Sequence, residues 1–338
     1  MNTTMSALVY EAPFQMNVRQ VPIPMIQPDE ALIRVAYSGI CGSELSGYEG
    51  KNSLRKPPLI MGHEFSGHLE ALGSAVDRPE LKVGAAVTAN PLLHCRQCRY
   101  CLSGKQQLCP HRKLLSAHLP GSNAEFVAIR ADALFLIPPE LSLATAALVE
   151  PAACAVHAAA LAAPAPDEQA LVVGAGPIGL MVIQALADRG IGQIFCIDLN
   201  AERLAMAEKL GAVPGTFESL ASQPVDIVVD AVGASATRQG CARVVRSGGR
   251  IVWIGLHESD TALPVNDFIR REITTYGSFA YTPIDFENAL QALAEKRIKL
   301  EEAWTQIEPL ENGTASFEKL LHGAPISKIW LAPNESTR

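Results

Sequence analysis

Residues 170–187 read ALVVGAGPIGLMVIQALA, and this stretch decides the fold of the second half of the chain. Its length and apolar character alone would allow a membrane span. However, its first half contains Gly174, Gly176, Pro177 and Gly179, residues that break or turn the backbone. We therefore interpret the stretch as a strand, a tight turn and a helix.

The turn has the pattern G-x-G-x-x-G, and it lies between a predicted strand and a predicted helix, as a dinucleotide-binding turn requires. The first glycine permits the tight turn, the second lets the backbone approach a pyrophosphate, and the third lets the helix pack on the strand. The free N–H groups at the start of the helix face the phosphates. The expected cofactor-binding residues of the turn are Gly174, Gly176, Pro177, Ile178 and Gly179.

The following strand ends in Asp198, 19 residues after Gly179. An acid at this position binds both ribose hydroxyls and repels a 2′-phosphate, so the sequence favours NAD over NADP. Arg203 could bind a 2′-phosphate, which would favour NADP over NAD. It could instead lie against the adenine. Without a cofactor, Asp198 would simply cap the next helix.

Strands and helices alternate through the second half, which predicts a parallel sheet covered by helices. The predicted strands are 171–173, 194–197, 226–230 and 250–254. The predicted helices are 145–163, 178–188, 202–210, 236–245 and 286–296. The first 150 residues contain short β-like runs separated by Gly and Pro, which predicts a largely antiparallel β domain.

The bulk properties are those of a globular protein. The 338 residues suggest two domains, and 48% hydrophobic with 19% charged residues excludes disorder. With a net charge of −7 and no basic cluster, we expect neither a nucleic acid nor a membrane as partner. No signal peptide is evident, so a cytoplasmic location is expected.

Four cysteines with the spacing C-x2-C-x2-C-x7-C lie in a segment, 93–110, that is predicted to be a loop. They are Cys95, Cys98, Cys101 and Cys109. This spacing is awkward for disulfides and natural for a tetrahedral metal. Four thiolates leave no open position, so the sequence predicts a structural zinc site.

A second, dispersed set of residues could form a catalytic metal site. It consists of Cys41 in GICGSE, His63 and Glu64 in GHEFSG, and Glu150 in VEPA. Each residue alone is weak evidence. Together they supply one sulfur, one nitrogen and carboxylate oxygens, and they leave a position open for substrate.

These motifs, in this order, resemble the zinc-containing medium-chain alcohol dehydrogenase family, in its sorbitol and polyol dehydrogenase-like branch. The resemblance covers essentially the whole chain. It implies a GroES-like, mainly β catalytic domain (1–147 and 284–338) and a Rossmann NAD-binding domain (148–283). It also implies two zinc ions per chain and oxidation of a secondary alcohol that is a polyol, a cyclitol or sugar-like.

Residue roles follow from the same resemblance. Cys41 and His63 are expected zinc ligands, and Glu64 and Glu150 each either bind the zinc or act beside it. Ser43 matches the hydroxyl that accepts the proton of the alcohol, which makes Ser43, Glu64 and Glu150 the expected catalytic residues. The remaining nicotinamide contacts are expected near Val232, Gly233, Ile254, Leu256 and Phe279.

The chain also departs from the family pattern. Many relatives have a histidine five residues after the ligand cysteine, where this chain has Ser46, and sorbitol dehydrogenases tend to have an arginine where this chain has Ala280. Threonine-type and sugar-phosphate substrates therefore stay open. Tyr48 and Leu115 are candidates for the substrate pocket.

Two alternative functions make different predictions for this sequence. A zinc-free quinone reductase should lack the cysteine loop, the Cys41/His63 pair and Asp198. A non-catalytic structural or regulatory protein should have lost a zinc ligand or Ser43. The chain keeps all of these residues. We expect a homo-oligomer, a tetramer rather than a dimer, in which strands within 250–276 pair between subunits.

Overall fold

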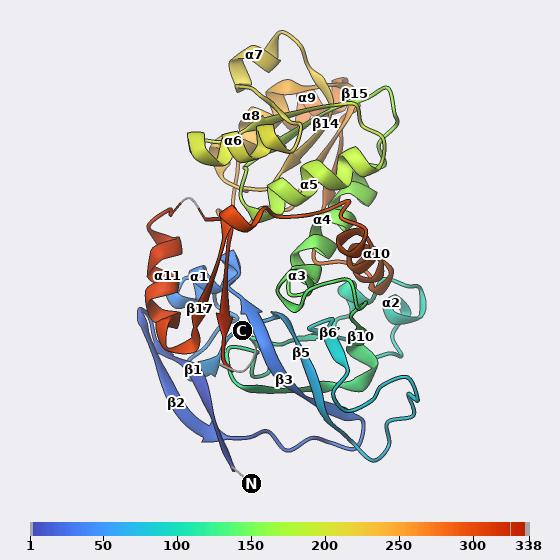
Figure 1. Cartoon of the computed structure of the whole chain (residues 1–338). Helices are drawn as coiled ribbons and strands as arrows, with labels where there is room; N and C mark the ends of the chain where they lie inside the picture. Colours follow the sequence, from blue (N-terminus) through green and yellow to red (C-terminus); the bar gives the residue numbers. More distant parts are fainter. Residues whose placement is uncertain (1–2, 325, 335–338) are drawn as a thin grey trace. The chain divides into compact units, whose positions relative to one another are not determined.

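The computed structural model describes residues 3–324 and 326–334, which divide into two compact units (Figure 1). One unit contains the described residues up to Glu150 and from Leu300 onwards, and the other runs from Pro151 to Lys299. The two boundaries between the units lie later in the chain than the expected boundaries at 147/148 and 283/284. The C-terminal boundary lies later because helix α10 (Pro283–Ala294) belongs to the second unit, where Asp285 bonds to His157 of helix α4 (Val149–Ala162).

The second unit is built on a six-stranded sheet in which every neighbouring pair of strands is parallel. The strand order is β13-β12-β11-β14-β15-β16, so the chain order reverses between β11 and β14. This is the order of the Rossmann fold, in which ligands lie beyond the carboxyl ends of the strands at that reversal. The strands are β11 (Gln169–Val173), β12 (Gln193–Ile197), β13 (Val213–Pro214), β14 (Val225–Asp230), β15 (Val245–Trp253) and β16 (Thr274–Gly277).

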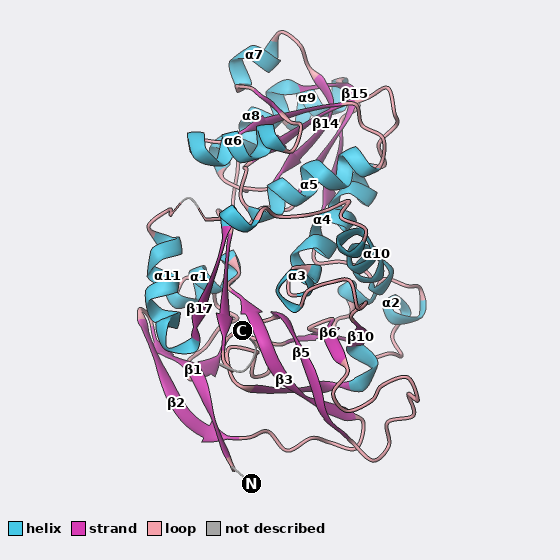
Figure 2. Ribbon diagram, viewed as in Figure 1, coloured by secondary structure: helices cyan, strands magenta, loops and turns pink. Residues whose placement is uncertain are grey.

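Helices cover this sheet, among them α5, which packs on β11, and α8, which packs on β14 (Figure 2). Leu171, Val228 and Cys241 belong to the buried cluster between strands and helices. No helix of the described residues, α5 included, is long and apolar enough to cross a membrane. Besides α4 and α10, the helices are α5 (Pro177–Asp188), α6 (Ala201–Lys209), α7 (Phe217–Ala221), α8 (Ser235–Val244) and α9 (Val265–Arg270).

The helix predicted over 145–163 is two helices, α3 (Leu143–Ala146) and α4. Pro151 explains the break, because it has no N–H to donate to the carbonyl four residues earlier and its ring clashes there. Ser142 caps α3 by accepting from the N–H of Thr145. The other predicted strands and helices of this half agree with the structure apart from shifted ends, of which the start of β15 differs most.

The first unit is a mainly antiparallel β structure. Its largest sheet follows the path β10-β6-β5-β3-β18-β17, and β9 also pairs with β3. Strand β18 (Lys328–Ala332), near the end of the chain, pairs antiparallel with β3 (Glu30–Gly39). The C-terminal segment therefore completes a sheet that begins in the first 40 residues.

The remaining elements of this unit connect these strands or flank them. The strands are β1 (Thr4–Ala12), β2 (Gln15–Pro22), β4 (Leu59–Ile60), β5 (Glu64–Leu72), β6 (Ala86–Ala89), β7 (Leu92–Leu93), β8 (Lys113–Leu114), β9 (Phe126–Arg130), β10 (Leu134–Leu136) and β17 (Thr305–Pro309). The helices are α1 (Gly42–Tyr48), α2 (Arg99–Leu102) and α11 (Gly313–Leu321), with short 3-10 turns at Gln106–Leu108, Ala131–Ala133, Glu302–Trp304 and Leu310–Asn312.

Candidate active site

The glycine turn joins β11 to α5 at the point where the strand order reverses. Gly174 has a φ of +96°, which favours glycine. A Cβ on Gly179 would come within 1.7 Å of the carbonyl oxygen of Gly174, whereas a Cβ on Gly176 would meet nothing within 4 Å. The open side of Gly176 and the free N–H groups at the start of α5 fit a diphosphate.

Asp198 lies at the carboxyl end of β12, beside this turn. Its Oδ2 accepts from the N–H of Ala175 at 2.6 Å and its Oδ1 accepts from the N–H of Asn200 at 2.8 Å. These bonds hold the carboxylate next to the glycine turn, where a ribose attached to a bound diphosphate would lie. Arg203 is half-buried in the first turn of α6, which Asn200 caps.

The other expected cofactor contacts follow β14, β15 and β16 at the same edge of the sheet, since parallel strands end together. Val232 and Gly233 donate their N–H groups to the buried Asp230 carboxylate at 3.0 and 2.9 Å. Burial raises the pKa of Asp230 despite these bonds. The last three of these residues, Ile254, Leu256 and Phe279, are at least partly exposed.

The four cysteines of the loop come together. Their Sγ atoms lie within 4.8 Å of one another, and Cys101 Sγ lies 3.5 Å from Cys98 Sγ and 3.9 Å from Cys95 Sγ. Sulfurs bound tetrahedrally at about 2.3 Å from zinc are about 3.8 Å apart. Cys109 completes the set and is fully buried. No disulfide joins the described cysteines, so the four thiols fit one closed zinc site.

Cys41, His63 and Glu64 form the second group, also with ligand atoms within 4.8 Å of one another. Cys41 immediately precedes α1, and the other two stand at the start of β5. Thiolate, imidazole and carboxylate are the donors that catalytic zinc sites use. Glu150, at the start of α4, is outside this group of described side chains, although its charge helps to raise the pKa of the nearby Lys328.

Lys328 is a site residue that was not predicted. Its buried Nζ lies 2.5 Å from Glu64 Oε2 and 3.1 Å from the carbonyl oxygen of Ile40. Burial alone would lower the pKa of Lys328, but the Glu64 carboxylate and the Cys41 thiolate raise it. The ammonium group therefore compensates part of the negative charge of the group. No local pattern around position 328 signals this role.

Glu44 is the second residue that was missed. Its fully buried Oε1 accepts from the N–H of Gly62 at 2.8 Å, from Ser116 Oγ at 2.6 Å and from His63 Nδ1 at 2.6 Å. A metal-binding histidine commonly has its second nitrogen fixed by such a carboxylate, which leaves Nε2 for the metal. The available signal was an acid three residues after Cys41, the spacing of a capping box at a helix start.

The charges of this pair stabilise each other. Burial alone would raise the pKa of Glu44, but His63 and Arg55 lower it to about 2. Burial alone would lower the pKa of His63, but Glu44 and Cys41 raise it well above its usual value. A metal that binds this imidazole would therefore displace a proton.

Ser43 lies beside Cys41. Its Oγ donates to Cys41 Sγ at 3.2 Å and accepts from Arg55 Nη2 at 3.1 Å. The predicted proton acceptor is thus next to a predicted zinc ligand. Ser46 is half-buried in the same helix, and its carbonyl accepts from the N–H groups of residues 51 and 52.

Tyr48 and Leu115, the candidates for the substrate pocket, are both buried. Leu115 is fully buried in a core cluster of the first unit. The hydroxyl of Tyr48 donates to Glu318 Oε1 at 2.6 Å, and its ring packs edge-on against Phe317. Both side chains face the interior because their apolar area is buried there.

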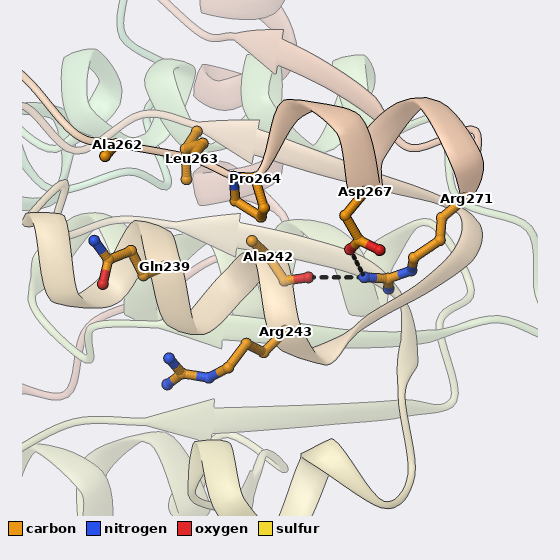
Figure 3. A pocket seen from close by; sticks show the side chains of 8 residues that line it. All are labelled: Gln239, Ala242, Arg243, Ala262, Leu263, Pro264, Asp267 and Arg271. Carbon is orange, nitrogen blue, oxygen red and sulfur yellow. Dashed lines mark hydrogen bonds and ion pairs between the residues drawn. The ribbon is translucent and has the colours of Figure 1, made fainter.

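A cavity of about 570 Å³ lies elsewhere in the second unit, between α8 and α9 (Figure 3). Arg271 spans it, donating to Asp267 Oδ2 at 2.8 Å and to the carbonyl oxygen of Ala242 at 3.2 Å. Helix α8 continues directly into β15, and Arg271 comes shortly before β16, so the cavity lies at the amino ends of these strands. The glycine turn lies at the opposite, carboxyl end of the parallel sheet. The residues that line it are Gln239, Ala242, Arg243, Ala262, Leu263, Pro264, Asp267 and Arg271.

Comparisons with known proteins show the family of both units. Residues 27–139 match the family model of the alcohol dehydrogenase GroES-like domain, and residues 177–295 match that of the zinc-binding dehydrogenases. The chain is 34% identical to a D-arabitol-phosphate dehydrogenase of Enterococcus avium, covering 99% of both chains. It is 33% identical to a sorbitol dehydrogenase of Bacillus subtilis strain 168, covering 94% of both.

A solved structure agrees along the whole chain. A protein described as a zinc-binding dehydrogenase of Sinorhizobium meliloti 1021, bound to NADP, superposes with a TM-score of 0.91. The identity is 26%, over 98% of this chain and 100% of that one. The expectations of a GroES-like unit and a Rossmann unit are confirmed.

Proposed function

This chain belongs to the zinc-containing medium-chain alcohol dehydrogenase family, in its polyol dehydrogenase-like branch, and from that premise we propose that it oxidises a secondary alcohol with NAD. The substrate class is a polyol, a cyclitol or a related sugar-like alcohol. The named relatives act on a sugar alcohol or on its phosphate, which supports this class.

One observation carries the proposal. Cys41, His63 and Glu64 present three different donor atoms to one point, and the Ser43 hydroxyl lies beside Cys41. Three protein donors are the arrangement of a catalytic zinc with a position left for substrate. When bound, zinc would act as a Lewis acid on the alcohol oxygen, and the nicotinamide would accept the hydride.

The residues of the chain perform the remaining tasks. Ser43 relays the proton: its Oγ accepts the proton of the alcohol while its own hydroxyl proton passes outward to water, as general-base catalysis requires of a group within hydrogen-bond reach. Glu44 holds His63 by its Nδ1, so the ring keeps one orientation. Lys328 holds Glu64 through one oxygen. Glu150 would either bind the zinc directly or hold its water molecule.

NAD is the proposed coenzyme because the Asp198 carboxylate is held at the end of β12. A 2′-phosphate placed there would face a negative charge. The solved relative was found bound to NADP, so Asp198 and Arg203 are the residues on which the preference of this chain depends.

The four-cysteine loop supports a second, structural zinc, giving two zinc ions per chain. We also propose a homotetramer, and a reducing compartment such as the cytoplasm, since thiolate ligands must stay reduced.

The decisive experiment measures NADH formation with a panel of polyols, cyclitols, sugar phosphates, threonine and simple secondary alcohols, with and without a zinc chelator. We expect turnover with a polyol-like substrate that the chelator abolishes and added zinc restores. Ser43→Ala should retain both zinc ions and lose at least about 100-fold in kcat.

If the zinc-loaded protein binds NADH and turns over nothing in the panel, the proposal fails in favour of a non-catalytic protein. Turnover confined to threonine or to sugar phosphates would instead correct the substrate class.

A further inference from the structure

Arg55 is a buried cation next to the candidate catalytic site, in the loop between α1 and β4. It is 4% exposed. Its Nη2 donates to Ser43 Oγ at 3.1 Å, and its Nε donates to Ser116 Oγ at 3.4 Å. The side chain fits because position 47 is glycine: a Cβ there would lie 2.4 Å from Arg55 Cδ.

The hydroxyls of Ser43 and Ser116 connect Arg55 to two of the residues in the Cys41, His63 and Glu64 group. Ser43 Oγ donates to Cys41 Sγ, and Ser116 Oγ donates to Glu44 Oε1, which also binds His63. One guanidinium therefore anchors a network that ends on a sulfur ligand in one direction and on a nitrogen ligand in the other. Its charge also helps to lower the pKa of Glu44.

We infer that Arg55 is a positioning residue for the dehydrogenase reaction, acting through Ser43 and Ser116; this inference rests on the proposed function. Arginine stays protonated in proteins, so Arg55 cannot accept the proton that Ser43 receives. Its donation occupies one acceptor site of Ser43 Oγ and fixes the direction in which the hydroxyl faces. The proton of the alcohol must then leave Ser43 by a path other than Arg55.

The planar shape of the guanidinium suits it to hold the two serine hydroxyls. It presents Nε and Nη2 in a fixed fork that reaches two hydroxyls at once, whereas a lysine ammonium is a single point on a flexible stem. Arg55→Lys should therefore keep the charge and lose one of the two contacts. This distinction separates positioning from simple charge compensation.

The test compares Arg55→Gln and Arg55→Lys with the native enzyme and with Arg78→Gln. Arg78 is a matched control, because it bonds to Glu80 and to the carbonyl oxygens of residues 131 and 134 in the same unit, outside this network. Three quantities are measured: kcat and KM for the alcohol found in the panel, the rate of zinc release to a chelator, and the visible spectrum of the cobalt-substituted protein.

For Arg55→Gln we expect a fall in kcat of about 10- to 100-fold, an unchanged KM for NAD, faster release of one zinc per chain and an altered cobalt spectrum. Arg55→Lys should recover part of kcat. Arg78→Gln should change thermal stability alone. A folded Arg55→Gln protein with native kcat, native zinc release and a native cobalt spectrum would overturn the inference.

Two further variants keep the inference testable if Arg55→Gln does not fold. Gly47→Ala leaves the arginine in place but pushes its stem aside, and it should reproduce the kcat loss in weaker form. Ser116→Ala cuts the branch to Glu44, and it should speed zinc release more than it lowers kcat. If both behave as the native enzyme, Arg55 does not position the site.

Zinc release and the cobalt spectrum need no substrate. If the native protein turns over no alcohol, the proposed function fails, and these two measurements still decide whether Arg55 orders the metal group.

Discussion

At the scale of single residues, Glu44 shows how a site can depend on a side chain outside the group of metal-binding residues. Three donors converge on its Oε1. Glu44→Gln replaces a carboxylate by a neutral amide, so the bond to His63 should weaken and the imidazole should lose its fixed orientation. We expect the affinity for the catalytic zinc to fall about 10- to 100-fold, measured by competition with a chelator.

The control for this variant is Glu49→Gln in the same region. Glu49 is outside the network and pairs with the exposed Lys51. It should leave both zinc ions in place. Equal zinc affinity in the two variants would show that Glu44 does not orient His63.

Asp198 should decide the choice between the two coenzymes. Asp198→Asn keeps the size of the side chain and one acceptor for the neighbouring N–H groups, but removes the charge that would repel a 2′-phosphate. The ratio of kcat/KM for NAD to that for NADP should fall by about tenfold, equivalent to about 1.4 kcal/mol. The exposed Glu202, on the first turn of α6, provides the control as Glu202→Gln. An unchanged ratio in Asp198→Asn would remove the reason for proposing NAD.

At the scale of elements, the segment 93–110 has little regular structure of its own beyond α2 and one 3-10 turn. Leu102 and Leu108 on it are exposed, so it buries too little apolar area to hold its shape. Cys98→Ser should remove one zinc per chain and make this segment the first site of limited proteolysis. Cys154→Ala, outside the loop, should keep both zinc ions. A Cys98→Ser protein with two zinc ions and native protease resistance would argue against a structural zinc.

The attachment of α10 to α4 is a second case at this scale. Asp285 Oδ2 accepts from His157 Nδ1 at 2.8 Å and from the N–H and hydroxyl of Thr282. This bond gives His157 a structural role. Burial alone would raise the pKa of Asp285, but His157 and Thr282 lower it.

This lowered pKa has a defined consequence for stability. A carboxylate whose pKa is lower in the folded than in the unfolded state stabilises the fold above its unfolded pKa, which is about 3.9 for aspartate. That stabilisation is lost as the pH falls through the folded pKa. Asp285→Asn should therefore lower stability by about 1–3 kcal/mol at pH 7, and the difference from native protein should shrink in acid, below about pH 4.

Thermal unfolding at a series of pH values measures this difference, and Glu287→Gln, on the exposed side of α10, is the control. A destabilisation of Asp285→Asn that stays constant down to pH 2 would contradict the assignment.

At the scale of the whole molecule, the parallel sheet ends in β16, which pairs with β15 and with no other described strand. Val265 and Ile269, on the neighbouring helix α9, are 61% and 69% exposed. An open strand edge beside apolar side chains favours association. Light scattering should give a mass about four times the 36.1 kDa of one chain, as the proposed tetramer requires. A monomer at micromolar concentration would refute it, and a dimer would correct the number of subunits.

The sequence by itself determined the features whose parts lie close together in the chain. The glycine turn and Asp198 span 25 residues, and the zinc loop spans 15. Their geometry follows from local backbone rules and ligand spacing. The alternation of strands and helices likewise predicted the parallel sheet covered by helices, because periodicity is a local signal.

Only the tertiary structure decided what surrounds these motifs. Lys328 meets Glu64 across 264 positions, and Ser116 meets Glu44 across 72. Sheet pairing and burial bring such residues together, and no spacing in the sequence encodes that contact. Arg55 and Glu44 are ordinary charged residues in the sequence. They become parts of the site because a buried charge must find a partner, and the fold determines which one it finds.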